Sequence, residues 1–350
     1  MRDGILIYGA NGYTGRLIAK TFAQADMRPI LAGRDGEKVK TIADNLGLPF
    51  TVFALEDKPA LDAALTGVVG VLHCAGPFAE TSKAMVDGCL RTGTHYLDIT
   101  GEIDVFEDCA LRGEAAAAAG IMLLPGCGFD VVPSDCLAVH MKTRLPDAVA
   151  LRLSISLPGA VSPGTMATGA IQVARISRAR RNGTIVDVPA PPRGTADFGK
   201  GPRRTVGISW GDVSTAFHST KIPNIDVAFE LTPQISQLTS LPSFLRGLLG
   251  SGAGQRLMRA YVRSVTAAPD ENGSPDAECV LIGEARNASG VVARSRLQTR
   301  GAYWLTAQTT LLIVNKVLAG NAPLGFQTPA LAYGKGLVLE VAGSTLTDLR

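Results

Sequence analysis

The chain has 350 residues, a formal net charge of +3 at pH 7 and 46% hydrophobic residues, which favours two globular domains over one. No stretch offers the roughly 20 apolar residues of a membrane-spanning helix, and Arg2 and Asp3 precede too short an apolar run for a signal peptide. The six cysteines form no CxxC pair or zinc-ligand pattern, so we expect a cytoplasmic protein without a metal site.

Charge divides unevenly along the chain. Residues 1–150 carry 13 Lys and Arg against 19 Asp and Glu, whereas residues 151–350 carry 21 against 12. The acidic first half and the basic second half indicate different partners for the two domains. The arginines of the second half are spread over several predicted elements with few aromatic residues between them, which argues against nucleic acid as a partner.

Short apolar runs alternate with helical periodicity in the first half. Residues 4–9 (GILIYG) read as a strand buried on both faces, and residues 13–25 repeat their apolar positions at helical spacing. The same alternation predicts further strands at 29–33, 50–55, 68–76, 95–100 and 121–126, and helices at 36–46, 59–65, 81–91 and 103–119. Six strands alternating with helices predict an α/β domain with a doubly wound parallel sheet.

The stretch GANGYTG joins the first strand to the first helix and has the spacing GxxGxxG in place of GxGxxG. Glycines at this turn let the backbone approach a diphosphate, whose charge is met by free N–H groups at the helix N-terminus. A purely structural turn is the alternative. The cofactor contacts predicted here are Gly9, Asn11, Gly12, Tyr13, Thr14 and Gly15.

The end of the second strand, LAGRDGEK, indicates which dinucleotide binds. An acidic residue there would bind the ribose 2′-hydroxyl, whereas an arginine accommodates a 2′-phosphate. Gly33 and Arg34 occupy this end, with Lys38 one helical turn later, so the sequence favours NADP(H). Asp35 is the objection, and we interpret it as the N-cap of the following helix.

Two later loops are expected to line the nicotinamide, because ligands of open α/β sheets bind outside the carboxyl ends of the strands. They are HCAGPF after the fourth strand and DITGE after the fifth, and ordinary strand-to-helix turns are the alternative. The contacts predicted from these loops are Ala75, Gly76, Pro77, Phe78, Thr100 and Gly101.

The second half has a different pattern. Residues 151–157 alternate apolar and polar side chains, as in a sheet with one wet face. Further strands are expected at NIDVAFEL, ECVLIGEA and VVARSRLQT, with helices at 165–181 and 303–318 and a Pro/Gly-rich loop at 188–202. These features predict an α+β domain with an antiparallel or mixed sheet.

An acid-free segment, 241–263, interleaves leucines and Phe244 with Arg246, Arg256, Arg259 and Arg263. Such a segment can lie on a membrane surface or cover a lipid chain. An amphipathic helix packed on its own sheet is the alternative.

The motifs YGANGYTG, LAGRD, CAGPF, GTHYLDITGE and GCGFDVVPSD, in this order, resemble the saccharopine dehydrogenase-like oxidoreductases. The later segments WGDVSTAFHSTKIPNIDVAF and TPALAYGKGLVLEVAG are similar to the branch that includes the trans-acting enoyl reductases of lipid biosynthesis. The resemblance implies a Rossmann domain over residues 1–132 that binds an NADP-type cofactor. It also implies a C-terminal helix at 328–349 that returns to this domain, and a domain at 133–327 for substrate and dimerisation.

For hydride transfer, the protein must orient the substrate and the cofactor and provide one group that donates a proton or polarises a carbonyl. None of the six tyrosines has a lysine four positions later, which disfavours a YxxxK mechanism. The remaining candidates are Tyr96, Asp98, Glu102, Asp130, His218 and Lys221, of which Glu102 and Asp130 are our predicted catalytic pair.

We therefore expect an NADPH-dependent reductase of an enoyl or carbonyl group on a lipid-type or acyl-thioester substrate. The open alternatives are an NADP(H)-binding regulatory protein without turnover, a lipid-surface binding module and a saccharopine-type amino-acid dehydrogenase. A homodimer and a peripheral membrane contact through 241–263 are compatible with this reading.

Overall fold

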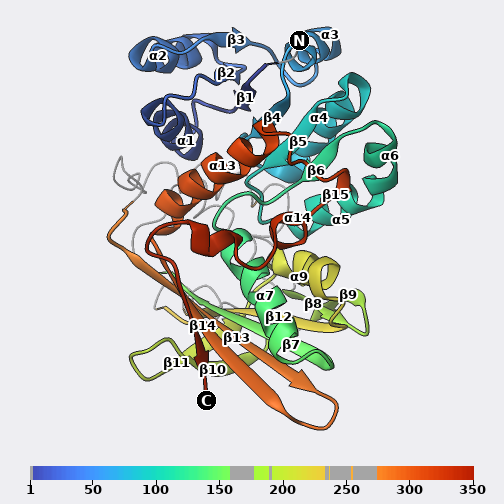
Figure 1. Ribbon diagram of the computed structural model, residues 1–350, viewed down its shortest axis with the longest axis vertical. Coiled ribbons are helices and arrows are strands. Elements are labelled where there is room, and N and C mark those ends of the chain that lie inside the picture. The colour runs from blue at the N-terminus through green and yellow to red at the C-terminus, as the bar shows by residue number, and fades with distance from the viewer. Residues whose placement is uncertain (1–2, 158–176, 189–190, 233–235, 237–253, 255–273) are drawn as a thin grey trace. The chain divides into compact units, whose positions relative to one another are not determined.

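The computed structural model describes residues 3–157, 177–188, 191–232, 236, 254 and 274–350. The chain divides into two compact units, and each is described by itself. The first unit comprises Met1–Val132 and Ala302–Val341, and the second comprises Pro133–Gly301 and Ala342–Arg350 (Figure 1).

A seven-stranded parallel sheet forms the centre of the first unit, in the order β15-β6-β5-β4-β1-β2-β3. The four residues of β1 and of β4 are all buried, as expected for strands covered on both faces. The order reverses between β1 and β4, where such sheets bind ligands. The strands are β1 (Ile5–Tyr8), β2 (Ile30–Gly33), β3 (Phe50–Val52), β4 (Gly70–His73), β5 (His95–Asp98), β6 (Met122–Leu124) and β15 (Gly325–Phe326).

Helices connect these strands as the alternation predicts. The predicted doubly wound α/β architecture is confirmed, and the predicted helix 103–119 is divided in two after Leu111. The helices are α1 (Tyr13–Gln24), α2 (Gly36–Leu46), α3 (Lys58–Thr66), α4 (Phe78–Thr92), α5 (Ile103–Leu111), α6 (Gly113–Ala118), α13 (Ala302–Leu318) and α14 (Pro329–Tyr333).

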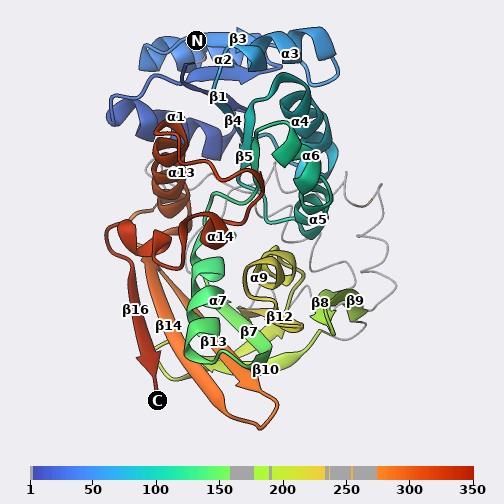
Figure 2. The same ribbon diagram turned by 45° about the vertical axis from the view of Figure 1, so that its right-hand side comes forward.

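Helix α13 and strand β15 belong to the first unit, which corrects the expectation that residues up to 327 lie in the second domain. Tyr303 of α13 packs edge-on against Tyr13 of α1, with ring centroids 5.0 Å apart, and Figures 1 and 2 both show the two helices side by side. Thr309 Oγ1 donates a hydrogen bond to the carbonyl oxygen of Cys127 at 2.8 Å. These contacts and the pairing of β15 with β6 tie the segment to the sheet.

The expected C-terminal helix 328–349 is not formed as one helix, although residues 328–341 belong to the first unit as expected. The segment forms the short helix α14, a 3₁₀ turn at Leu337–Glu340 and strand β16 (Thr345–Leu349), which pairs with β14 in the second unit (Figure 2). Gly334 and Gly343 have φ near +82°, a conformation that interrupts helices. The alternation of TLTDL is typical of a strand.

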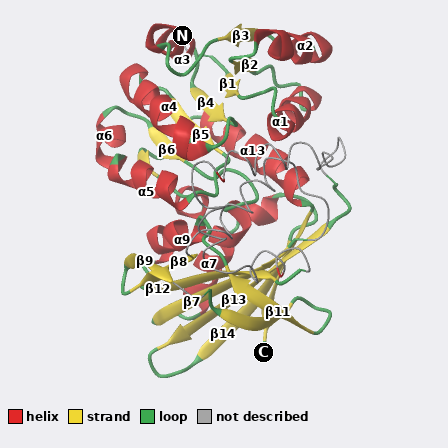
Figure 3. Cartoon of the chain, turned by 180° about the vertical axis from the view of Figure 1, so that it is seen from behind, coloured by secondary structure: helices red, strands yellow, loops and turns green. Residues whose placement is uncertain are grey.

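A mixed sheet forms the second unit, as predicted (Figure 3). All of its pairings are antiparallel except that of β7 with β12. Helix α7 (Val132–Arg144) packs on β13 at Gly283, where a Cβ would lie 2.8 Å from Met141 Cγ. The other elements are β7 (Ala148–Ser156), β8 (Ser177–Arg181), β9 (Thr184–Val188), β10 (Arg193–Asp197), β11 (Pro202–Gly207), α9 (Asp212–Thr220), β12 (Asn224–Glu230), β13 (Glu278–Asn287) and β14 (Val292–Arg300).

Three predictions in this half need comment. The end of the expected helix 165–181 is strand β8, which pairs with β9 through a turn at Asn182 and Gly183, both at positive φ; residues 165–176 lie outside the described residues. The expected loop 188–202 contains β10. Apart from Gly254, segment 241–263 also lies outside them. Within the described residues, no helix is long and apolar enough to cross a membrane.

Candidate nucleotide site of the first unit

The carboxyl end of β1 is crowded by backbone from a neighbouring loop. Gly9 has φ +85°, and a Cβ atom on it would lie 2.7 Å from the amide nitrogen of Ala75, which follows β4. A Cβ on Gly15 would lie 2.4 Å from the carbonyl oxygen of Gly9. The glycines at the two ends of GANGYTG are therefore required by the fold of the turn, which draws α1 close against β1.

The middle glycine leaves the N-terminus of α1 open. Gly12 is the N-cap with extended backbone, it has no side chain to cap the helix, and no acidic residue lies in the first turn of α1. Among the described residues, a Cβ on Gly12 would meet one atom within 4 Å, the Gly9 carbonyl oxygen at 3.4 Å. A helix N-terminus at a glycine-rich turn, with no acidic residue in the first turn, fits a diphosphate, because the N–H groups of a first helical turn and the helix dipole both favour an anion.

Arg34 and Asp35 follow β2 beside this turn. Asp35 caps α2, because its side chain accepts a hydrogen bond from the Lys38 backbone N–H. It also forms an ion pair with the Lys38 ammonium at 2.7 Å, and both contacts lower the pKa of Asp35. Its interpretation as an N-cap is confirmed. Arg34 is exposed, and the Asn11 side-chain oxygen would lie 3.4 Å from a Cβ on neighbouring Gly33. The carboxylate is thus engaged, while the guanidinium faces solvent where a 2′-phosphate is expected.

Glu102 connects the two loops that were predicted to line the nicotinamide. Its Oε1 accepts a hydrogen bond from the Phe78 amide and its Oε2 from the Ala79 amide, both at 2.9 Å. These amides belong to the first turn of α4, so an internal carboxylate caps this helix. The first turn of α1, in contrast, contains no acidic residue of its own.

Asp98, at the end of β5, is a fully buried carboxylate that organises the same edge of the sheet. Tyr96 donates a hydrogen bond to Oδ2 at 2.6 Å, and the amides of Thr100 and Gly126 donate to Oδ1 at 2.9 and 2.8 Å. Burial raises the pKa of Asp98 to about 6 although these donors lower it. Asp98 therefore joins the loops after β5 and β6 and is structural.

Asp130, in the loop after β6, lies beside the DITGE loop. A Cβ on Gly101 would lie 3.1 Å from Asp130 Oδ2. Burial, with a smaller contribution from the negative charge of Glu102, raises the pKa of Asp130 to about 7. The structure thus brings the two predicted catalytic carboxyls to the same edge, and it gives them different environments.

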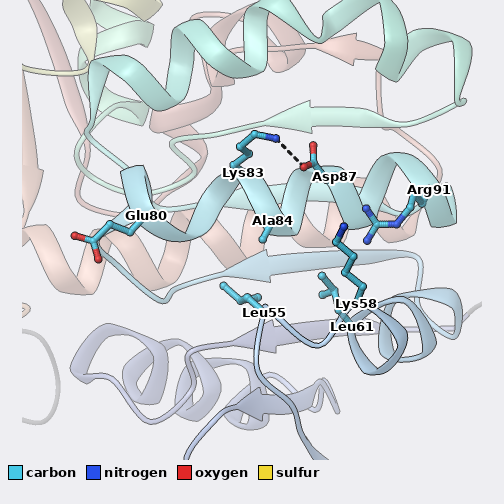
Figure 4. Close-up of a pocket in the computed structure, with 8 residues that line it drawn as sticks. All are labelled: Leu55, Lys58, Leu61, Glu80, Lys83, Ala84, Asp87 and Arg91. Carbon is cyan, nitrogen blue, oxygen red and sulfur yellow. Dashed lines mark hydrogen bonds and ion pairs between the residues drawn. The ribbon is translucent and has the colours of Figure 1, made fainter.

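The remaining candidates are placed elsewhere. His218 and Lys221 lie on α9 and at its C-cap, in the second unit. A hollow of about 240 Å³ lies between α3 and α4 (Figure 4). Two of the cations in its lining are in ion pairs, Lys83 with Asp87 and Arg91 with Asp62, and exposed Lys58 lines it as well. Among the described residues, no group of three or more His, Cys, Asp and Glu could hold a metal ion.

Comparison with known families identifies residues 5–124 of the first unit. Residues 5–124 match the family described as the saccharopine dehydrogenase NADP binding domain. These residues form an NADP-binding domain of that family. The sequence-based resemblance to saccharopine dehydrogenase-like proteins is confirmed, as is NADP as the cofactor of this domain.

Mycobacterial proteins are similar to this chain. A trans-acting enoyl reductase of Mycobacterium leprae is 35% identical over 40% of this chain, and the match spans 36% of that relative, about a third of its length. A putative trans-acting enoyl reductase of Mycobacterium tuberculosis is 25% identical over 99% of this chain and 90% of its own. Saccharopine dehydrogenase (L-Glu forming) of Saccharomyces cerevisiae has the same fold, with a TM-score of 0.66 and 12% identity over 99% of this chain and all of its own.

Sequence reasoning missed several residues that shape the NADP-binding domain. Thr306 of α13 accepts a hydrogen bond from the Phe129 amide at 2.9 Å. His73 and Thr81 hold the loop after β4. No local signal marks Thr306, which is 177 residues from its partner. His73 could have been noticed as a polar residue in an otherwise apolar strand.

Proposed function

We propose that the chain is an NADPH-dependent oxidoreductase that reduces an enoyl or carbonyl group of a lipid-type substrate such as an acyl thioester. The observation that carries the proposal is the glycine-rich turn at the N-terminus of α1, with Gly12 as the N-cap and no acidic residue in the first turn, beside an exposed Arg34. The names of the similar mycobacterial proteins support the reaction class. The excess of Lys and Arg in residues 151–350 supports an anionic substrate.

Different residues of the domain would bind different parts of the cofactor. Amides of the first turn of α1 would hold the diphosphate, and Arg34 would hold the 2′-phosphate. The loops that follow β4 and β5, from Ala75 to Phe78 and from Thr100 to Gly101, would lie along the nicotinamide. When bound, NADPH supplies the hydride. The protein must then orient the substrate and supply a proton.

Asp130 is the proposed proton donor. A carboxyl with a pKa of about 7 is largely protonated just below neutral pH and can both give and take a proton. Glu102 has both oxygens bound by the α4 amides, an arrangement that favours its ionised form. In the proposal Glu102 is therefore a capping residue whose charge helps to keep Asp130 protonated, and Asp130 alone transfers a proton.

The test is a turnover assay. Purified protein would be mixed with NADPH and a panel of enoyl and ketoacyl thioesters, and NADPH oxidation would be followed by absorbance, with Asp130→Asn as the matched control. Turnover that Asp130→Asn loses while still binding NADPH supports the proposal. Tight NADPH binding without turnover on any substrate would instead support a regulatory protein. Activity confined to amino acids and 2-oxo acids would support an amino-acid dehydrogenase.

A further inference from the structure

His73 is a polar residue in the core of the NADP-binding domain. It ends β4, its side chain is completely buried, and it stands among the rings of Tyr8, Phe78 and Tyr96 at centroid distances of 5.6, 5.5 and 6.3 Å. Burial lowers its pKa to about 3, so the ring is neutral near physiological pH. A phenylalanine would fill such a site without any need for a hydrogen-bond partner, so the imidazole calls for an explanation.

One ring nitrogen has a partner that defines the tautomer. His73 Nε2 lies 2.9 Å from Thr81 Oγ1. The same hydroxyl donates a hydrogen bond to the carbonyl oxygen of Ala75 at 2.7 Å, and the carbonyl oxygen of Pro77 is a second acceptor at 3.0 Å. Carbonyl oxygens only accept, so the single hydroxyl proton of Thr81 is directed at them and Nε2 must carry the proton that Thr81 accepts. Nδ1 is then an acceptor, and it has no partner among the described residues.

This relay fixes the direction of one peptide group. In a trans peptide the C=O and the following N–H point in opposite directions. The Ala75 carbonyl is turned toward Thr81, so the N–H of Gly76 points away from α4. Gly76 is exposed, and among the described residues the nearest atom to a Cβ on it would be a ring carbon of Phe78 at 3.6 Å, so a ligand can approach this residue from solvent.

We propose that His73 is a positioning residue, which acts through Thr81 to present the Gly76 N–H as a hydrogen-bond donor to the nicotinamide half of the cofactor. The inference rests on the proposed function and adds to it. The adenosine half would bind at Gly12 and Arg34, on the other side of the crowded contact between Gly9 and Ala75. The relay should therefore affect the two halves of NADPH differently.

The experiment compares Thr81→Val, which removes the hydroxyl at nearly constant shape, with Thr81→Ser, which keeps it. Calorimetry would measure the affinity for NADPH and for 2′,5′-ADP, a probe of the adenosine half. We expect Thr81→Val to weaken NADPH binding about five- to tenfold, as for one lost hydrogen bond, and to change 2′,5′-ADP binding less than twofold. Thr81→Ser should restore the NADPH affinity, and His73→Phe, if its thermal midpoint shows that it folds, should behave like Thr81→Val.

Equal NADPH affinity in Thr81→Val and the unmodified chain would overturn the inference and leave the proposed function intact. A parallel loss for both nucleotides that Thr81→Ser does not rescue would also overturn it, because that is the signature of a merely structural pair. If the unmodified chain binds 2′,5′-ADP but not NADPH, the proposed function fails first and the inference falls with it.

Discussion

A Cβ atom on Gly9 would lie 2.7 Å from the amide nitrogen of Ala75, so the loops after β1 and β4 touch through their backbones. These strands are neighbours at the point where the order of the sheet reverses. Backbone groups therefore form the surface that a dinucleotide would meet there. The fold itself requires glycine at positions 9 and 15, where a Cβ would clash with backbone atoms, whereas at Gly12 only a bound ligand would require it.

The two later glycines of the turn should respond differently to alanine. Gly15→Ala places a Cβ 2.4 Å from the Gly9 carbonyl oxygen, so we expect a loss of about 1–3 kcal/mol in the free energy of unfolding. Gly12→Ala has room in the protein, so its stability should change by less than about 1 kcal/mol while its NADPH affinity falls at least about tenfold. Denaturant titration and calorimetry measure the two effects. An unchanged NADPH affinity in a folded Gly12→Ala variant would remove the diphosphate from this turn.

Arg34 should decide between the phosphorylated and unphosphorylated cofactors. We expect Arg34→Ala to weaken NADPH binding at least about tenfold, because a charge-assisted contact to the 2′-phosphate is lost, and to leave NADH binding unchanged. Asp35→Asn is the control, since asparagine can still cap α2 and the carboxylate is already engaged by Lys38. A fall in NADH affinity in Asp35→Asn would show that Asp35 binds the ribose instead.

Asp130 predicts a pH dependence of the proposed reduction. Its pKa of about 7 means that the proton-donating form is lost as the pH rises through 7, so kcat/KM should fall there. Asp130→Asn should lose most of the activity, and the activity that remains should no longer show this fall (the alkaline limb of the pH profile). In Glu102→Gln the limb should move to lower pH, because the negative charge that helps to raise the pKa is gone. A limb that stays in place in Glu102→Gln contradicts the assigned coupling.

The raised pKa of Asp98 predicts that the free energy of unfolding falls as the pH rises, whereas a salt-bridged carboxylate would make it rise. Its pKa is raised from 3.8 to about 6 in the folded state, so its stabilising contribution is complete below pH 3.8 and is lost as the pH rises through 6. The free energy of unfolding of the unmodified chain should fall relative to Asp98→Asn by on the order of 2–3 kcal/mol between pH 4 and 7. Urea titrations across this range measure the difference, and parallel pH curves would refute it.

Asp348 fastens β16 in the second unit. Its carboxylate contacts His140 Nε2 and Ser295 Oγ at 2.8 Å and Arg144 Nε at 3.3 Å, contacts that lower its pKa. The contribution of Asp348 to the free energy of unfolding is therefore present above the ordinary pKa of 3.8, and it is lost as the pH falls through the lower pKa of the folded state. Amide hydrogen exchange of residues 345–349 should accelerate in Asp348→Ala.

The exposed neighbour Thr347 offers the control, because Thr347→Ala leaves these contacts in place. Exchange in that variant should match the unmodified chain. Unchanged exchange in Asp348→Ala would show that β16 is held by its backbone pairing with β14 alone, and equal acceleration in both variants would show an effect of side-chain truncation that does not depend on the Asp348 carboxylate.

The first six strands could be predicted because each is a short apolar run closed by turn residues. β1 and β4 are buried on both faces, so their sequences carry no polar interruptions apart from His73. The N-cap role of Asp35 was also readable, since an aspartate before a helical pattern is a local signal. Local signals of this kind need no knowledge of distant contacts.

The errors arose where two local patterns compete or where contacts are distant. The helix expected at 165–181 is wrong at its C-terminal end, because Asn182-Gly183 is a strong hairpin signal and residues 177–188 form β8 and β9. The position of α13 depends on bonds such as Thr306 to Phe129, far apart in the chain. The contact of Glu102 with the amides of α4 also depends on a partner 24 residues away, so it could not be predicted from the local sequence.

The return of α13 and β15 to the first sheet has a consequence during synthesis. The ribosome must make about 170 residues between Val132 and Ala302 before these elements exist. At roughly 5–20 residues per second this takes on the order of 10–30 s. During that interval the nascent β6 edge and the surface of α1 that Tyr303 later covers are open to solvent, so a chaperone that shields apolar surface would find its target there.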